Sequence, residues 1–222
     1  MKGLLIKDFQ LAKTQGKMLL IVALVIGVFM EIAGMSEGFV TGYITIIMSV
    51  FAATSISYDE YENCFSFLLV LPVSRKEYVN EKYVFSGILI FSAWLVGLTV
   101  GSVFRIIRGE PVLSAEWLAG CFSYITVAVV FLSLMLPLRL KFEGEKGRVV
   151  LPIAIAAMGI LIYGGGKLAN LVGIDVTGSS IKVLNQMGAA GIMAMLVIIP
   201  VAAAVISWIC SRHILEKKEF WR

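Results

Sequence analysis

The feature that most constrains this chain is a succession of apolar blocks, each about as long as a membrane is thick. An apolar helix of about 20 residues crosses the roughly 30 Å of hydrocarbon in a bilayer. Hydrophobic residues make up 59% of the 222 positions and charged ones only 15%, so little chain is left for a soluble domain. The sequence predicts one all-α integral membrane domain, residues 1–222, with six transmembrane helices at about 18–35, 39–57, 83–104, 116–138, 149–166 and 188–211.

The basic residues predict the orientation of these spans. Of the 19 lysines and arginines, 15 fall in the N-terminal tail, in 58–82, in 139–149 and in the C-terminal tail. Only 4 fall between the other pairs of spans, at 105–115 and 167–187. The positive-inside rule therefore places both termini and the 58–82 segment in the cytoplasm. Because the basic residues lie at the ends of apolar blocks, the net charge of +4 does not indicate nucleic-acid binding.

The N-terminal stretch, residues 2–17, has two interpretations. One side of a helix would carry Lys7, Gln10, Thr14 and Lys17, and the other Leu5, Phe9 and Ala12, which is typical of an amphipathic helix on the membrane surface. Asp8 and Gln15 interrupt the apolar side, and a solvated basic tail that orients the first span fits equally well. No cleavage site follows a short apolar core, so we expect the first span to be retained.

A stripe of small and hydroxyl residues marks one face of the second predicted span. Thr41, Thr45 and Ser49 recur four residues apart. Such stripes usually let helices approach closely and hydrogen-bond, although a substrate-facing translocation path is the alternative. In the third span, Gly97 and Gly101 form a GxxxG pair that predicts a helix contact.

Motifs for catalysis or ion-driven pumping are lacking in the sequence. The GGGK at 164–167 is not a phosphate-binding loop, because that motif needs a glycine where Leu161 stands and a hydroxyl residue where Leu168 stands. The three cysteines are widely spaced and there is one histidine, so neither a zinc site nor a paired serine and base is expected. Ionisable residues are also missing from the middle of the spans, where ion-coupled transporters usually place them.

The charged segment 58–82 predicts two helical pieces separated by a turn. Its first apolar residues recur at steps of three and four, which predicts an amphipathic helix at 60–71 that lies on the membrane or in a groove of a partner protein. Pro72 ends this helix. Ser74 and Glu77 then have the spacing of a capping box, so a new helix should begin at Arg75.

This second helix should project beyond the membrane. It runs from Arg75 to Phe104, a stretch longer than the hydrocarbon core, so its first turns should reach the cytoplasm. Arg75 and Lys76 oppose the helix dipole in its first turn. Either lipid phosphates or an acidic groove on a partner would explain them.

The layout of a basic N-terminal helix, a tight first hairpin and the phrase LPVSRKEYVNEKY at 71–83 resembles a known family. It is similar to the small ABC-2 type permease subunits of bacterial ABC exporters, which have a type V exporter-like fold. Within that group it is most similar to the compact six-helix permeases of exporters for amphipathic peptides, such as the phenol-soluble modulin exporter of staphylococci.

The resemblance implies the partners, the location and the site. It implies two permeases, as a homodimer or a paralogous heterodimer, in the bacterial cytoplasmic membrane with two cognate ABC ATPase subunits. ATP and Mg would bind those partners, and this chain would carry no cofactor, metal or catalytic residue. The 60–71 segment would be the coupling helix, and the residues implied in ATPase coupling are Asp59, Glu60, Phe65, Leu68, Leu69, Pro72, Arg75, Lys76 and Lys82.

The expected function is that of a permease subunit in an ATP-driven exporter. A hydrophobic or amphipathic substrate, such as a peptide, suits spans without charges better than a polar solute, which needs hydrogen-bonding partners along its route. The alternative is a membrane protein without transport, an immunity or scaffold subunit that sequesters a toxic peptide or anchors a partner.

Overall fold

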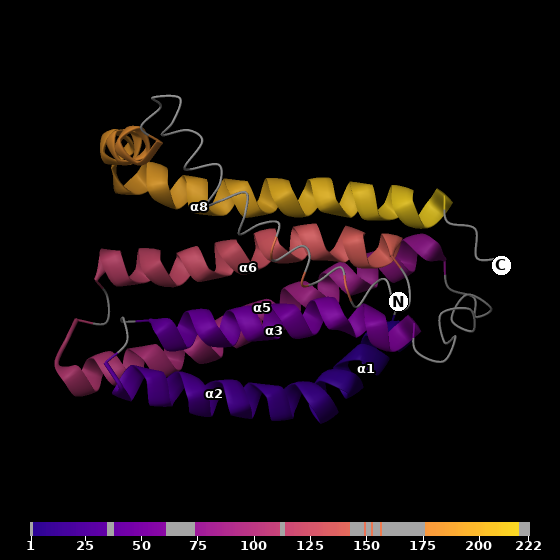
Figure 1. Cartoon of the computed structure of the whole chain (residues 1–222), viewed down its shortest axis with the longest axis horizontal. Coiled ribbons are helices and arrows are strands. Elements are labelled where there is room, and N and C mark those ends of the chain that lie inside the picture. Colours follow the sequence, from indigo (N-terminus) through magenta and orange to yellow (C-terminus); the bar gives the residue numbers. More distant parts are fainter. Residues whose placement is uncertain are drawn as a thin grey trace.

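A computed structural model describes residues 2–34, 38–60, 74–111, 114–142 and 176–217, together with the isolated positions 149, 152 and 156. Every regular element in this part of the chain is helical. The elements are α1 (Lys2–Leu11), the π-helix η1 (Ala12–Gly16), α2 (Lys17–Ile32), α3 (Phe39–Glu60), α5 (Arg75–Arg108), α6 (Ala115–Lys141) and α8 (Val176–Lys217) (Figure 1).

The predicted spans correspond closely to these helices. Five helical stretches are long and apolar enough to cross a membrane: Gly3–Ile32, Phe39–Asp59, Arg75–Arg108, Trp117–Lys141 and Ala194–Lys217. Each overlaps one of the six predicted spans, with bounds that differ by up to 15 residues in the first. The remaining one, at about 149–166, lies outside the described residues, so the total of six stays a prediction.

Helix α3 occupies the centre of the bundle. It packs against α2, α5 and α6, while α8 packs against α6 and, less extensively, against α5. Of the spanning stretches, α3 is the most buried and α8 the least. The outer faces of α2 and α8 carry exposed apolar side chains such as Val25 and Ile206, which would suit contact with lipid.

The helix ends gather into two groups at opposite ends of the bundle. The start of α1, the end of α3, the start of α5 and the ends of α6 and α8 lie together at one end, on the right in Figure 1. The ends of α2 and α5 and the start of α6 lie at the other. Helices α6 and α8 run in the same direction.

The predicted N-terminal helix is present, but no break separates it from the first span, as a separate helix on the membrane surface would require. It continues through η1 directly into α2. Leu4 and Asp8 are buried, and Phe9 meets Phe85 of α5 edge to face, with ring centroids 5.6 Å apart. α1 therefore packs on α5; that it also lies on the membrane surface stays a prediction.

The GxxxG pair forms the predicted helix contact. A Cβ atom added at Gly97 would lie 2.7 Å from the Cα of Thr41 in α3, and one at Gly101 would lie 3.2 Å from Thr41 Oγ1. These positions have no room for larger side chains at the present spacing of the helices. The two glycines thus bring α5 close to the central helix α3.

Candidate functional site

Helix α5 begins where its capping residues predict. The Ser74 Oγ accepts a hydrogen bond from the Glu77 backbone N–H at 3.2 Å, and the Ser74 N–H donates to the Glu77 carboxylate at 3.0 Å. This reciprocal pair satisfies two backbone donors that a helix start otherwise leaves open. In the helix that follows, Tyr78, Glu81 and Lys82 are three and four residues apart, so they fall on one face, and all three are buried.

Lys82 is the centre of a buried ionic cluster. Its ammonium group contacts the carboxylate of Asp8 in α1 and lies 2.7 Å from Asp59 Oδ2 in α3. Tyr78 donates its phenolic O–H to the same Asp59 oxygen at 2.9 Å, and Lys7 contacts Asp59 Oδ1. Lys82 and Asp8 have no exposed surface, and Asp59 has almost none. Three helices therefore meet at this site.

We call these residues the ion-pair cluster: Lys7, Asp8, Asp59, Tyr78, Glu81 and Lys82. Its charges do not balance, because two lysines face three carboxyl groups. Both carboxyl oxygens of Glu81 are buried and receive no hydrogen bond from the described residues. Burying ions is costly unless they are closely paired, so the cluster depends on the lysine contacts. Among all the residues that the structure describes, no group of three or more His, Cys, Asp or Glu side chains is placed to hold a metal ion.

Arg75 and Lys76 contact the end of α8. Arg75 donates from Nη1 to the backbone carbonyls of Leu215 and Glu216, each at 3.1 Å, and Lys76 pairs with the Glu216 carboxylate at 3.1 Å. The last carbonyls of a helix lack intrahelical donors and carry partial negative charge. These contacts give the two basic residues a role within the chain, beside the lipid or partner contacts expected for them.

The rest of the predicted coupling segment lies outside the described residues. This applies to Phe65, Leu68, Leu69 and Pro72, and also to the side chain of Glu60. Of the predicted coupling residues, the structure brings Asp59 and Lys82 together in the ion-pair cluster. It places Arg75 and Lys76 one to two turns away, against α8.

Sequence reasoning did not identify the partners of Lys82. Asp8 lies 74 residues from Lys82 in the chain, and no local pattern connects such positions. The available signal was that Asp8 interrupts the apolar side of the N-terminal helix. A charged residue on an otherwise apolar face favours a buried partner, and the nearby segment 58–82 offers several.

The same end of the bundle holds a second polar contact that was not predicted. Arg139, near the end of α6, is buried and donates to the Ser57 hydroxyl of α3 at 2.5 Å. Together with the ion-pair cluster, this contact ties the last turns of α3 to α1, α5 and α6.

Comparison with protein families gave a match that covers nearly the whole chain. Residues 3–216 match the model of the ABC-2 family transporter proteins. The chain belongs to the ABC-2 family of transporter proteins. Comparison with curated proteins and with solved structures gave no match.

Membership defines the general role of this ABC-2 protein. It is a multi-pass membrane protein and the permease of an ABC transporter, a transport subunit that is not itself a catalytic enzyme. The family implies an ABC ATPase as its partner. The ion-pair cluster thus belongs to a permease. Its residues Asp59 and Lys82 lie before and after the segment 61–73, which follows the second span.

The predicted translocation face of this permease is packed within the chain. Thr41, Thr45 and Ser49 have no exposed surface. Thr45 donates to the Thr41 carbonyl at 2.6 Å, and Ser49 to the Ile46 carbonyl at 2.7 Å. Both hydrogen bonds lie within α3, and it is the complete burial of the three side chains that supports the helix-packing interpretation. A role of the three residues in substrate passage stays a prediction.

Proposed function

We propose that this ABC-2 protein is the permease subunit of an ATP-driven exporter for a hydrophobic or amphipathic substrate, such as a peptide. Two permeases, identical or paralogous, would work with two ATPase subunits in the bacterial cytoplasmic membrane. Both termini would face the cytoplasm. The segment 60–71 would receive the motion of the ATPase and pass it to the spanning helices.

The observation that supports this proposal most strongly is the position of the ion-pair cluster. The proposed coupling segment leaves α3 just after Asp59 and rejoins the described chain at Ser74, two turns before Lys82. Lys82 is paired with both Asp59 of α3 and Asp8 of α1. A force on the segment would therefore act on α1, α3 and α5 together, because buried ion pairs resist separation.

The interior of the permease supports an apolar or amphipathic cargo. Along the middle of the described spans, the buried side chains are apolar, small or hydroxyl-bearing, as with Ile44, Ala52 and Ser86. Among the residues that the structure describes, buried charges are confined to the two ends, with Lys82 at one and Arg105 at the other. A strongly polar solute would lack fixed partners along such a route.

The test is reconstitution of the permease with its ATPase in proteoliposomes. Replacing Phe65, Leu68 and Leu69 together by Asp should abolish substrate-stimulated ATP hydrolysis, because an apolar contact cannot accept three buried charges. Phe142→Asp is the matched control. Phe142 is exposed at the same end of the bundle, just after α6, and its replacement should leave hydrolysis unchanged.

Two results would count against the proposal. Survival of substrate-stimulated hydrolysis in the triple variant would refute the coupling role of 60–71. If an ATPase made inactive in hydrolysis still allowed the permease to protect cells from a toxic peptide, the immunity or scaffold function would replace export.

A further inference from the structure

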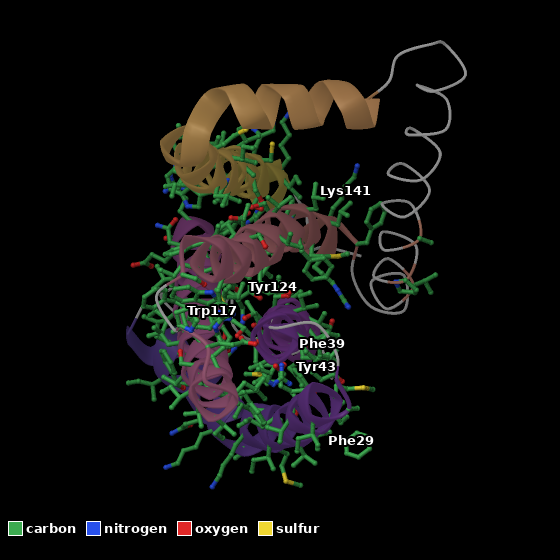
Figure 2. All side chains as sticks on the ribbon, turned by 90° about the vertical axis from the view of Figure 1, so that its left-hand side faces the viewer. Phe29, Phe39, Tyr43, Trp117, Tyr124 and Lys141 are labelled. Carbon is green, nitrogen blue, oxygen red and sulfur yellow. The ribbon has the colours of Figure 1, made fainter. Side chains whose placement is uncertain are left out.

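A second polar site lies at the opposite end of the bundle from the ion-pair cluster. A cavity of about 230 Å³ opens there between α5, α6 and the start of α3. Its lining includes Gly38, Arg105, Ser114, Trp117, Cys121 and Tyr124. Figure 2, viewed from this end, shows Trp117 and Tyr124 close to each other beneath α6. We call it the Arg105 cavity.

The start of α6 supplies most of the lining. Ser114 is the N-cap of this helix, and Trp117, Cys121 and Tyr124 follow at steps of three and four, so they share the face that turns toward α3 and α5. The Ser114 side chain makes no capping hydrogen bond. The first backbone N–H groups of a helix lack intrahelical acceptors and carry partial positive charge, which favours an anion at this place.

Arg105 adds a full positive charge to the cavity. The side chain is largely buried, with its guanidinium 5.5 Å from the Trp117 ring centroid. Its Nε–H donates to the Pro111 carbonyl at 3.2 Å, and Nη2 contacts the Ser114 hydroxyl at 3.4 Å. Glu110 Oε2 lies 3.5 Å from Nη1 and is buried without a hydrogen bond from the described residues, so it is a poorly placed acceptor that a closer phosphate oxygen could replace.

The indole N–H of Trp117 is a second indication of a ligand, independent of these charges. The Trp117 side chain is 94% buried, since only 6% of its surface is exposed, yet its Nε1–H has no acceptor among the described residues. Nε1 lies 3.9 Å from the position of a Cβ at Gly38, across the cavity wall. Buried donors are nearly always paired, so this one is placed for an acceptor that enters the cavity.

We propose that the Arg105 cavity binds the phosphate of a phospholipid head group. Arginine, an indole N–H and a helix start together offer donors and positive charge to phosphate oxygens. The cavity is smaller than the roughly 300–1,000 Å³ of drug-sized ligand sites, so it holds a head group and not a whole amphipathic molecule.

The surroundings favour a lipid over a free anion. Ile106 and Ile107 follow Arg105 directly and are 65% and 73% exposed. They belong to the last turns of the spanning helix that supplies Arg105, so acyl chains attached to the bound phosphate could cover them. Trp and Tyr beside a basic residue are also typical of the membrane interface.

The test is titration of the purified permease in detergent with phosphatidylglycerol, measured by native mass spectrometry. Arg105→Gln should weaken the apparent lipid affinity of the tightest site about tenfold, and Trp117→Phe, which keeps an aromatic ring, about fivefold. Arg108→Gln is the matched control. Arg108 lies one turn away and contacts Glu31 outside the cavity, so this variant should bind like the unaltered protein.

A competition experiment distinguishes the phosphate of a lipid head group from free inorganic phosphate. Inorganic phosphate at millimolar concentration should not displace the bound lipid. If it does so, the site takes a free anion and the lipid assignment is wrong. Unchanged lipid affinity in both Arg105→Gln and Trp117→Phe, or an equal loss in Arg108→Gln, would overturn the site itself. Because Trp117→Phe replaces a buried indole by a smaller ring, thermal melting of this variant checks that the fold is intact.

Discussion

At the scale of single residues, the pairing of Lys82 with Asp8 and Asp59 has the largest energetic consequence. All three groups are almost inaccessible to solvent, so none of them can be stabilised by water if a partner is removed. Removing one partner alone should therefore destabilise the fold strongly. Replacing all the partners by apolar residues of similar size would change the free energy of unfolding much less.

Lys82→Met should be strongly destabilising. Removing the ammonium leaves two buried carboxylates without their central cation, and we expect the free energy of unfolding to fall by about 3–5 kcal/mol. Reversible unfolding in mixed micelles measures it. The control is Lys7→Gln, whose side chain is 39% exposed and should cost less than about 1 kcal/mol. Equal effects of the two variants would refute the central position of Lys82.

Unlike Lys82→Met, the variant Glu81→Gln should not be strongly destabilising. Glu81 adds the third carboxyl group to a cluster with two lysines, and no described residue donates a hydrogen bond to its oxygens. Replacing it with the isosteric amide removes the excess charge, so the free energy of unfolding should stay within about 1 kcal/mol or rise. The same unfolding experiment measures this change. A loss as large as that of Lys82→Met would mean that Glu81 is a required ionic partner.

At the scale of helices, α5 connects the two sites of the permease. Its first turns hold the ion-pair cluster and the end of α8, its middle packs on α3 through glycines, and its last turns supply Arg105. A helix is stiff along its axis over this length, so a displacement at one end is carried to the other. The close contact at Gly97 and the Lys82–Asp59 pair would pass such a displacement to α3.

Gly97→Ala tests that contact directly. The new methyl group would meet the Thr41 backbone at 2.7 Å, so α3 and α5 would have to separate, at a cost of about 1–3 kcal/mol. Gly87→Ala is the matched control in the same helix, because nothing lies within 4 Å of the added atom. That variant should be neutral or slightly stabilising, since alanine favours helix. Thermal melting of both variants in detergent gives the comparison, and equal melting temperatures would contradict the contact.

The sequence could predict the local part of this arrangement and little of the rest. The capping box at Ser74 and the GxxxG pair involve residues three or four apart, so their patterns are visible in the chain. The partner of Lys82 and the lining of the Arg105 cavity come from helices far apart in sequence. Their meeting depends on how helices are rotated and stacked, which no single periodic pattern specifies.

At the scale of the whole molecule, the helix ends next to the segments predicted to be cytoplasmic all lie at one end of the bundle. The start of α1, the ends of α3, α6 and α8 and the start of α5 form one end of the bundle, and these are the positions next to the lysine-rich and arginine-rich segments (Figure 1). The assignment of that end to the cytoplasm stays a prediction from the positive-inside rule.

Reporter tags inserted at Gly109 and at the C-terminus test this orientation. Gly109 ends α5 in a left-handed conformation with open space around it, so an insertion there should be tolerated. We expect the Gly109 tag to be labelled from outside the cell and the C-terminal tag only after permeabilisation. Labelling of both tags from outside would contradict an even number of spans.

The most direct test of the proposed coupling is site-specific photo-crosslinking in the assembled transporter. A photoreactive amino acid at Phe65 should crosslink the permease to its ATPase. The same group at Ile107, which is 73% exposed at the opposite end of the bundle, should not. A crosslink to the ATPase from position 107, with none from position 65, would contradict both the coupling role of 60–71 and the cytoplasmic location of the ion-pair cluster.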